Sequence, residues 1–373
     1  MKVKKGLSSQ GVSVDSKSLT ILLKEASRFS STWRVDMVAA GVLIRSGENG
    51  FEAVSTDSMS FFRAAIESRG NLDPVVVNPK ILLKLIQGFN GTVRIEKEDS
   101  KIKVTSDVSM KTSFREAADF PLPTNRDGSE LSFQADEDFV KRLEYVRRAC
   151  SNDISRVGLG DVRLEKGALK ATDGHRAAKT IGTSYGWKDS ILSLPAIVCD
   201  SVISVVDKGS FPEIRLSAGA TNGFIHGTSE SGAIRKFEIS FCLKNEVFPD
   251  LDQVTPAIFE NTFSVNVKDL SVVLSKLSKL AEKVESGLLF EAEGKVLKVS
   301  SIGSDPGECV ESEIEIDSTE ESKPVKFVLN PLYVLDAIKF SGVDVVNVRI
   351  ADSSCPVVLD SEGIRSIVMP CRL

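Results

Sequence analysis

The amino-acid sequence predicts an α+β protein made of three repeated domains, each with two helices packed on one face of an antiparallel sheet. The first observation is length, because 373 residues are too many for one ordinary hydrophobic core. The second is that the order helix, hairpin, helix and paired strands recurs three times. The third is that landmarks in this order return at intervals above 110 residues, so the unit is a domain rather than a solenoid repeat.

The first copy begins with a helix around residues 19–26, where apolar side chains follow the i, i+3, i+4, i+7 spacing. Residues 42–44 and 51–54 read as a hairpin. Pro79 begins a second helix, with Leu82, Leu85, Ile86 and Phe89 at helical spacing, because proline suits the first helical turn. Two further strands lead to Phe120-Pro121.

The second and third copies repeat this order. Their first helices lie around residues 139–150 and 270–277, and Pro195 and Pro331 begin their second helices. The three helix-opening prolines are 116 and 136 residues apart, and the closing pairs Phe120-Pro121, Phe248-Pro249 and Met369-Pro370 are 128 and 121 apart. We therefore expect domains at residues 1–128, 129–256 and 257–373.

Composition indicates a soluble protein. Apolar residues make up 42% of the chain and charged residues 27%, with no apolar run near the roughly 18 residues of a membrane span. The basic start lacks the apolar core of a signal peptide, so a cytosolic location is expected. The six cysteines contain no Cys-x-x-Cys pair and there are two histidines, so no metal and no cofactor is expected.

Basic residues gather on the predicted helices. Residues 17–28, 80–84 and 268–283 carry a net charge of +6, which leaves −11 for the rest of a chain whose total is −5. A solvated helix face is the plain interpretation of any one helix. Taken together, the helices suggest a surface that meets the phosphates of duplex DNA without sequence preference. The expected DNA contacts are Lys24, Arg28, Arg34, Lys80, Lys84, Lys141, Arg148, Lys276, Lys279 and Lys283.

One turn in the second copy looks catalytic at first. In Ala171–Lys179, a turn at Asp173-Gly174 presents His175 and Arg176 beside Thr172 at a strand end. However, the sequence has no Gly-x-Ser-x-Gly elbow, no phosphate-cradling loop and no carboxylate cluster. We expect no catalytic residues. A hydrolase that uses Asp173 and His175 is the remaining enzymatic alternative, and unchanged activity of His175→Ala would eliminate it.

Three motifs, together with the threefold repetition, resemble the bacterial DNA polymerase III beta subunit family, the sliding clamps. They are Ala171-Thr172-Asp173-Gly174-His175-Arg176, Phe248-Pro249-Asp250 and the C-terminal Val368–Leu373. The resemblance implies a head-to-tail homodimer whose six domains form a ring with twelve helices inside. Helices about 10 Å wide would enclose a bore of about 28 Å, which admits duplex DNA. The implied function is a non-enzymatic processivity factor. The alternative is a clamp-like scaffold that binds partner peptides without loading on DNA.

The resemblance also implies a pocket between the second and third domains that takes short peptide motifs of the replicative polymerase, the clamp loader and repair proteins. Its expected residues are Leu159, Thr172, Gly174, His175, Arg176, Ala177, Pro249, Val254, Val357, Ile367, Val368, Met369, Pro370, Cys371, Arg372 and Leu373. Ala177, Leu251 and Cys371 depart from the family pattern, and Ala177 and Cys371 are smaller than the residues usual there. The chain therefore reads as a diverged member. The turn at Asp173 also has a partial counterpart in the first copy, Thr56-Asp57, so we interpret it as a shared structural device that the second copy has elaborated.

Overall fold

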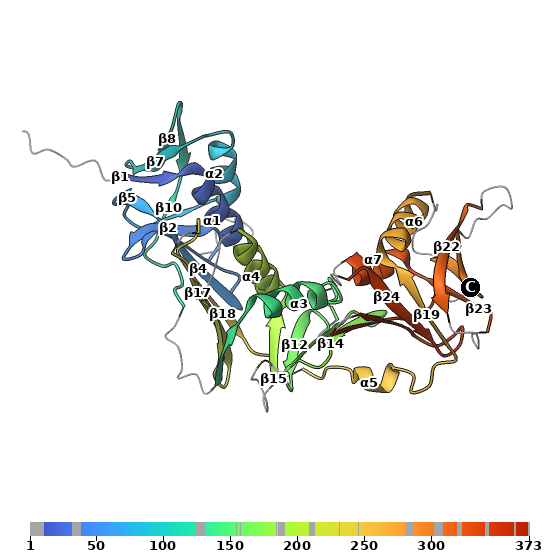
Figure 1. The fold of residues 1–373 in the computed structure, drawn as a ribbon. Coiled ribbons are helices and arrows are strands. Elements are labelled where there is room, and N and C mark those ends of the chain that lie inside the picture. Colours follow the sequence, from blue (N-terminus) through green and yellow to red (C-terminus); the bar gives the residue numbers. More distant parts are fainter. Residues whose placement is uncertain are drawn as a thin grey trace, which may run out of the picture. The chain divides into compact units, whose positions relative to one another are not determined.

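The computed structural model describes residues 11–31, 39–123, 131–153, 155–156, 158–183, 185, 191–208, 213–230, 232–244, 246–280, 287–301, 309–318, 323–339, 343–361 and 363–371. The order of elements recurs three times, as the sequence predicts, and the whole is an α+β fold of antiparallel sheets. Figure 1 shows the elements coloured along the chain. We call each of the three copies a repeat.

The first repeat is the most elaborate. Its second helix, α2 (Pro79–Ile86), ends before Phe89, which the sequence placed at helical spacing. The elements are β1 (Gly11–Asp15), α1 (Ser16–Arg28), β2 (Val42–Gly47), β3 (Gly50–Thr56), β4 (Ser60–Ile66), β5 (Ser68–Gly70), β6 (Val75–Val77), α2 (Pro79–Ile86), β7 (Thr92–Lys97), β8 (Lys101–Thr105), β9 (Ser109–Ser113) and β10 (Arg115–Glu116).

The later repeats keep the same order with fewer short strands. The second contains β11 (Leu131–Ala135), α3 (Glu137–Arg147), β12 (Asp161–Glu165), β13 (Ala168–Thr172), β14 (Arg176–Thr180), β15 (Ile191–Pro195), α4 (Ala196–Lys208), β16 (Glu213–Ala218), β17 (Asn222–Thr228) and β18 (Lys236–Cys242). A one-turn helix, α5 (Leu251–Val254), follows it. The third contains β19 (Asn261–Asn266), α6 (Val267–Leu280), β20 (Leu288–Glu293), β21 (Val296–Ser301), β22 (Glu311–Ser318), β23 (Val325–Leu329), α7 (Pro331–Lys339), β24 (Val345–Ile350), β25 (Val357–Ser361) and β26 (Ile364–Val368).

Helix starts follow from capping residues. The Asp15 carboxylate accepts a hydrogen bond from the Ser18 amide at 2.9 Å, and the Asn78 amide oxygen accepts from Lys80 at 3.0 Å, just before Pro79. Asn266 caps α6 in the same way. These bonds satisfy amides that the first helical turn leaves without partners. Leu19, Leu22, Leu23 and Ala26 on α1 are buried, which confirms the predicted apolar stripe.

The repeats are joined through their sheets. A nine-stranded sheet runs β10-β6-β2-β3-β4-β18-β17-β16-β11, and a twelve-stranded sheet runs β15-β12-β13-β14-β26-β25-β24-β19-β22-β21-β20-β23. Strand β4 of the first repeat therefore pairs with β18 of the second, and β14 of the second pairs with β26 of the third. We call these two pairings the first and second strand seams. A separate five-stranded sheet runs β5-β1-β7-β8-β9.

By compactness the chain divides into two units, residues 1–140 with 197–244 and residues 141–196 with 245–373. The first seam lies inside the first unit, and the second seam lies inside the second. The second repeat is thus shared between the units, and the two domain boundaries expected at residues 128 and 256 stay a prediction. In the described part of the chain, no helix is long and apolar enough to cross a membrane.

Candidate functional site

The turn that connects β13 to β14 is held by a fixed set of hydrogen bonds. Thr172 Oγ1 donates to the Arg176 carbonyl at 2.6 Å and accepts from the Gly174 amide at 3.1 Å. The Asp173 carboxylate accepts from the amides of His175 and Arg176, both at 2.9 Å. Gly174 has φ of 87°, a left-handed conformation that glycine adopts without strain.

The first repeat contains the same turn. Thr56 Oγ1 donates to the Ser60 carbonyl at 2.8 Å and accepts from the Ser58 amide at 2.9 Å, and Asp57 accepts from the amides of Met59 and Ser60. Ser58 takes the left-handed conformation in place of Gly174, with φ of 78°. This match confirms that the Thr-Asp turn is a shared structural device. In both turns the aspartate carboxylate accepts hydrogen bonds from backbone amides, so its role there is structural.

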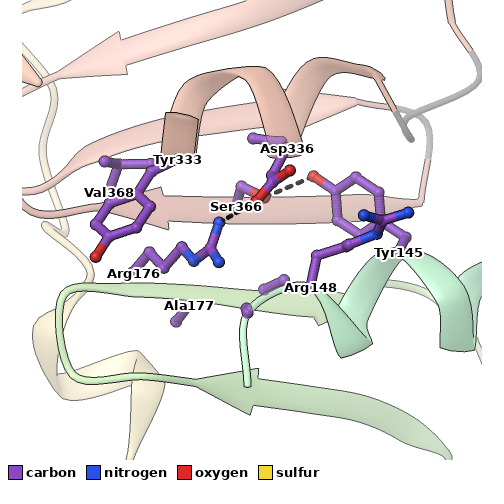
Figure 2. Close-up of a pocket in the computed structure, with 11 residues that line it drawn as sticks. Tyr145, Arg148, Arg176, Ala177, Tyr333, Asp336, Ser366 and Val368 are labelled. Atoms are coloured by element: carbon purple, nitrogen blue, oxygen red, sulfur yellow. Dashed lines mark hydrogen bonds and ion pairs between the residues drawn. The ribbon is translucent and has the colours of Figure 1, made fainter. Parts of the chain in front are cut away.

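In the second repeat the turn also fixes an arginine. Arg176 Nε donates to Asp173 Oδ2 at 3.0 Å, and its terminal nitrogen donates to Asp336 Oδ2 on α7 at 2.6 Å. Its guanidinium lies 4.4 Å from the centre of the Tyr333 ring. Figure 2 shows Arg176 reaching from β14 toward Tyr333 and Asp336. Arg176 therefore ties the second repeat to the third within the second unit.

His175 is exposed at the tip of this turn. Its Nε2 lies 3.5 Å from a terminal nitrogen of Arg156, and the other terminal nitrogen of Arg156 donates to the Asp173 carbonyl at 2.6 Å. The Met369 amide donates to the His175 carbonyl at 2.9 Å. The imidazole is therefore placed at a surface rim beside an arginine, while the Asp173 carboxylate serves the backbone and Arg176. This arrangement does not resemble a nucleophile–base pair.

Strand pairing brings several of the expected pocket residues together. Ala177 pairs with Ile367, Arg176 with Val368, and Val357 with Val368. A Cβ at Gly174 would lie 3.9 Å from Leu159, so Leu159 also borders the turn. Ala177 and Ile367 form a buried apolar cluster with Leu251 and Val358, against which Phe248 and Phe259 pack.

Other expected residues take different positions. Val357, Ile367 and Val368 are all buried. Ile367 belongs to the Ala177 cluster and can form the floor of a site, whereas Val357 and Val368 belong to the core of the third repeat. Val254 and Met369 are exposed to 46% and 40% and can contact a partner. Pro249 is exposed, and Pro370 and Cys371 are half-buried, with burial raising the pKa of the Cys371 thiol. Arg372 and Leu373 lie outside the described residues.

A shallow cleft lies on the helix side of the second seam (Figure 2). Arg176, Ala177 and Val368 line it from the sheet. Tyr145 comes from α3, Arg148 from the residue directly after α3, and Tyr333 and Asp336 from α7. Sequence reasoning missed Tyr145, Tyr333, Asp336 and Arg156. The helical pattern placed Tyr333 and Asp336 on α7, but nothing in the sequence paired that helix with β14.

Tyr145 is the most strongly shifted group in this cleft. Its hydroxyl lies 2.5 Å from Ser366 Oγ, and burial raises its pKa to about 12. A raised folded-state pKa gives stability that is present below pH 10 and is lost as pH rises from 10 toward 12.

We therefore expect Tyr145→Phe to lower the free energy of unfolding by about 1 kcal/mol at pH 8, because a buried hydrogen bond is lost. Wild-type protein should then lose about 2 kcal/mol more than the variant between pH 8 and pH 11.5. Urea unfolding of both proteins between pH 8 and pH 11.5 measures this, and parallel curves would contradict the assignment.

The expected DNA contacts lie on helix surfaces where the structure describes them. Exposed basic residues on α1, α2, α3 and α6 are Lys24, Arg28, Lys80, Lys84, Lys141, Lys276 and Lys279, and Arg148, directly after α3, is also exposed. Acidic neighbours include Glu25, 3.0 Å from Arg28, and Glu144, 3.7 Å from Arg148. Arg34 and Lys283 lie outside the described residues. No group of three or more metal-binding side chains occurs in the described part of the chain.

Three repeats of two helices on antiparallel strands, joined edge to edge through their sheets, define the sliding-clamp fold. Residues 252–372 match the family model for the C-terminal domain of the DNA polymerase III beta subunit. A search of curated protein sequences gave no match.

Solved structures extend the likeness to the whole chain. The beta subunit of Thermotoga maritima is 22% identical with a TM-score of 0.84, covering 97% of this chain and 99% of that one. The beta subunit of Borrelia burgdorferi, in complex with a natural product, is 15% identical with a TM-score of 0.85, covering 98% and 99%. The Pseudomonas aeruginosa sliding clamp bound to griselimycin is 19% identical with a TM-score of 0.77, covering 98% and 100%. The chain has the fold of these beta subunits.

Proposed function

We propose that the protein is a DNA sliding clamp, a processivity factor without catalytic activity of its own. Two copies would close head to tail into a ring around duplex DNA and tether the replicative polymerase, the clamp loader and repair proteins. The observation that carries this proposal is the repeated strand seam. The two seams within one chain use equivalent strands, so they indicate which strands and which register a third seam between copies would use.

The two seams have the same register. At the first, Phe62 on β4 faces Ile239 on β18; at the second, Ala178 on β14 faces Ser366 on β26. Phe62 and Ala178 are matched positions, since each pairs with a core-facing residue of the preceding strand, Ser55 or Ala171. Each seam thus joins the fourth strand of one repeat to the last long strand of the next.

Strands β22 and β9 hold the equivalent places in the third and first repeats and take part in neither of these two seams. In the third repeat, Ser312 on β22 pairs with Val299 and so corresponds to Phe62 and Ala178. In the first repeat, Met110 on β9 pairs with Val104 and corresponds to Ile239 and Ser366. Strand β9 ends its sheet, and among the described residues the outer edge of Glu311–Glu315 has no paired strand. A third seam between copies in the same register would place Ser312 opposite Met110 of the partner subunit.

The chemistry of these two edges is complementary. That register puts Glu311 directly opposite Lys111 of the partner subunit, which is a favourable cross-strand pair. The edges also expose large apolar side chains, Val108 at 51%, Met110 at 39% and Val310 at 39%. Closing the ring would cover these side chains and remove two open sheet edges, which otherwise invite aggregation.

The second-unit site supports the tethering role. An exposed rim of His175, Val254 and Met369 surrounds a buried apolar floor at Ala177 and Ile367, a surface suited to an extended peptide with aliphatic and aromatic side chains. The small Ala177 leaves more room there than a leucine would. The ligand-bound relatives from B. burgdorferi and P. aeruginosa show that proteins of this fold hold ligands. A cytoplasmic site of action fits this role.

Retention on DNA tests the proposal. The protein is loaded with its clamp loader on a nicked circular plasmid, and the bound fraction is measured by gel filtration before and after a restriction enzyme cuts the circle. Loaded protein should stay on the circle and leave the linear form, because it is held by topology and only weakly by contacts. Equal retention on both forms would contradict a ring, and no loading at all would favour a peptide-binding scaffold.

A further inference from the structure

The helices at the first seam meet through a buried acid. Glu25 on α1 is 0% exposed, and its carboxylate accepts from Ser204 Oγ at 2.7 Å and from Ser201 Oγ at 3.5 Å, both on α4. Arg28 Nε lies 3.0 Å from the same carboxylate. The first helix of one repeat is thus joined to the second helix of the next by an acid with a cation and hydroxyl donors.

The helices at the second seam also meet around an acid. Asp336 on α7 forms an ion pair with Arg176 and lines the same cleft as Tyr145 on α3 and Arg148 directly after it. Asp336 is the fifth residue after Pro331, which begins its helix. Asp200 is likewise the fifth residue after Pro195, which ends β15 and immediately precedes α4 (Ala196–Lys208) in the second repeat. Both second helices that lie at a seam within the chain therefore carry an aspartate at this position.

The positions that a third seam would use are all basic, with no acid among them. Lys84 is the fifth residue after Pro79 on α2, where the other two repeats have aspartate. On α6, Lys276 and Lys279 lie ten and thirteen residues after the cap Asn266, as Glu25 and Arg28 do after Asp15. All three lysines are exposed, and none forms an ion pair with another described residue.

We propose that the helix seam between two copies is a binding site for DNA phosphodiesters, built by Lys276 and Lys279 of one copy and Lys84 of the partner subunit, so that duplex DNA stabilises the closed ring. The proposal rests on the ring of the preceding section. Without an anion the three ammonium groups repel one another across the seam. A phosphodiester between them converts this repulsion to attraction.

The consequence is a coupling between DNA binding and ring closure. If the closed seam binds phosphate better than the open one, bound DNA must favour closure by the same factor. The strand edges of the third seam, with Glu311 opposite Lys111, favour closure whether or not DNA is present. The helices oppose closure until DNA is inside. A ring of this kind opens more readily before it is loaded than after.

Subunit exchange measures the coupling. Donor- and acceptor-labelled dimers are mixed, and the exchange rate is followed by energy transfer with no addition, with a 40-base-pair duplex, and with inorganic phosphate at equal ionic strength. The duplex should slow exchange about tenfold. Inorganic phosphate should have little effect; a slowing equal to that of the duplex would overturn the assignment to DNA.

Two variants make the test specific. Lys84→Asp installs the residue found at the matching positions of the other repeats, so exchange without DNA should slow severalfold and the response to duplex should shrink. Lys295→Asp changes the charge equally at a hairpin turn, away from all helices, and should exchange like wild type. Equal DNA-free exchange of Lys84→Asp and wild type would overturn the coupling. A wild-type protein that is monomeric throughout would instead contradict the ring itself.

Discussion

Replacing Glu311 by lysine is expected to dissociate the dimer. In the register carried over from the two seams, Glu311 faces Lys111 of the partner subunit, and a head-to-tail ring contains this pair twice. The variant puts like charges directly opposite each other at both interfaces, which should weaken dimerisation on the order of 100-fold. Sedimentation at micromolar concentration would then show a monomer.

The charge swap tests the register itself. The double variant Glu311→Lys with Lys111→Glu again has opposite charges at both interfaces and should return to a dimer. Within one chain Glu311 lies 2.6 Å from Lys298, and Lys111 lies 2.5 Å from Glu98, so circular dichroism must confirm that each variant is folded. Glu293→Lys, on an exposed hairpin turn, is the matched control. A double variant that stays monomeric would contradict the predicted register.

Charges placed on the rim of the peptide site should abolish processive synthesis. Val254 and Met369 are exposed apolar side chains beside the buried cluster of Ala177 and Ile367, and each would bury apolar area against a partner. Burial of such a side chain contributes about 1.5 to 3 kcal/mol, so Val254→Asp with Met369→Asp should lower partner affinity at least 100-fold. Primer extension by the polymerase and loader of the same cell would give the short products seen without the protein.

The control for this variant is Ile258→Asp. Ile258 is 80% exposed and lies four residues beyond Val254, outside the expected pocket, so its product lengths should match wild type. Thermal unfolding of both proteins should be nearly unchanged, because all three side chains are at the surface. Long products from the double variant would show that partners dock elsewhere.

The repeat and its helices could be predicted because their signals are local. Apolar residues at helical spacing, capping residues and helix-opening prolines specify α1, α2, α6 and α7 within short stretches. The Thr-Asp turn could be recognised for the same reason, since its hydrogen bonds join residues no more than four apart.

Contacts between distant segments could not be predicted in this way. Arg176 and Asp336 are 160 residues apart, and their ion pair depends on the pairing of β14 with β26, which no local pattern encodes. From the sequence, Glu25 is simply an acidic residue on a basic helix. The structure shows that its side chain is fully buried and accepts a hydrogen bond from Ser204 on α4. Burial of this kind depends on which repeat packs beside the helix. For the same reason, Val357 is part of the core and not of a contact surface.

The continuous sheets also determine how this chain can be cut. Strand β4 pairs with β18, as β14 does with β26. A fragment that ends at residue 128 would therefore expose the edge of β4 around Phe62, where strands of other molecules could pair with it. The unit that can stand alone is therefore not the repeat seen in the sequence. Each autonomous fragment would have to carry half of the second repeat. If whole repeats are exchanged between related chains, the strand that pairs with the exchanged repeat must therefore be preserved as well.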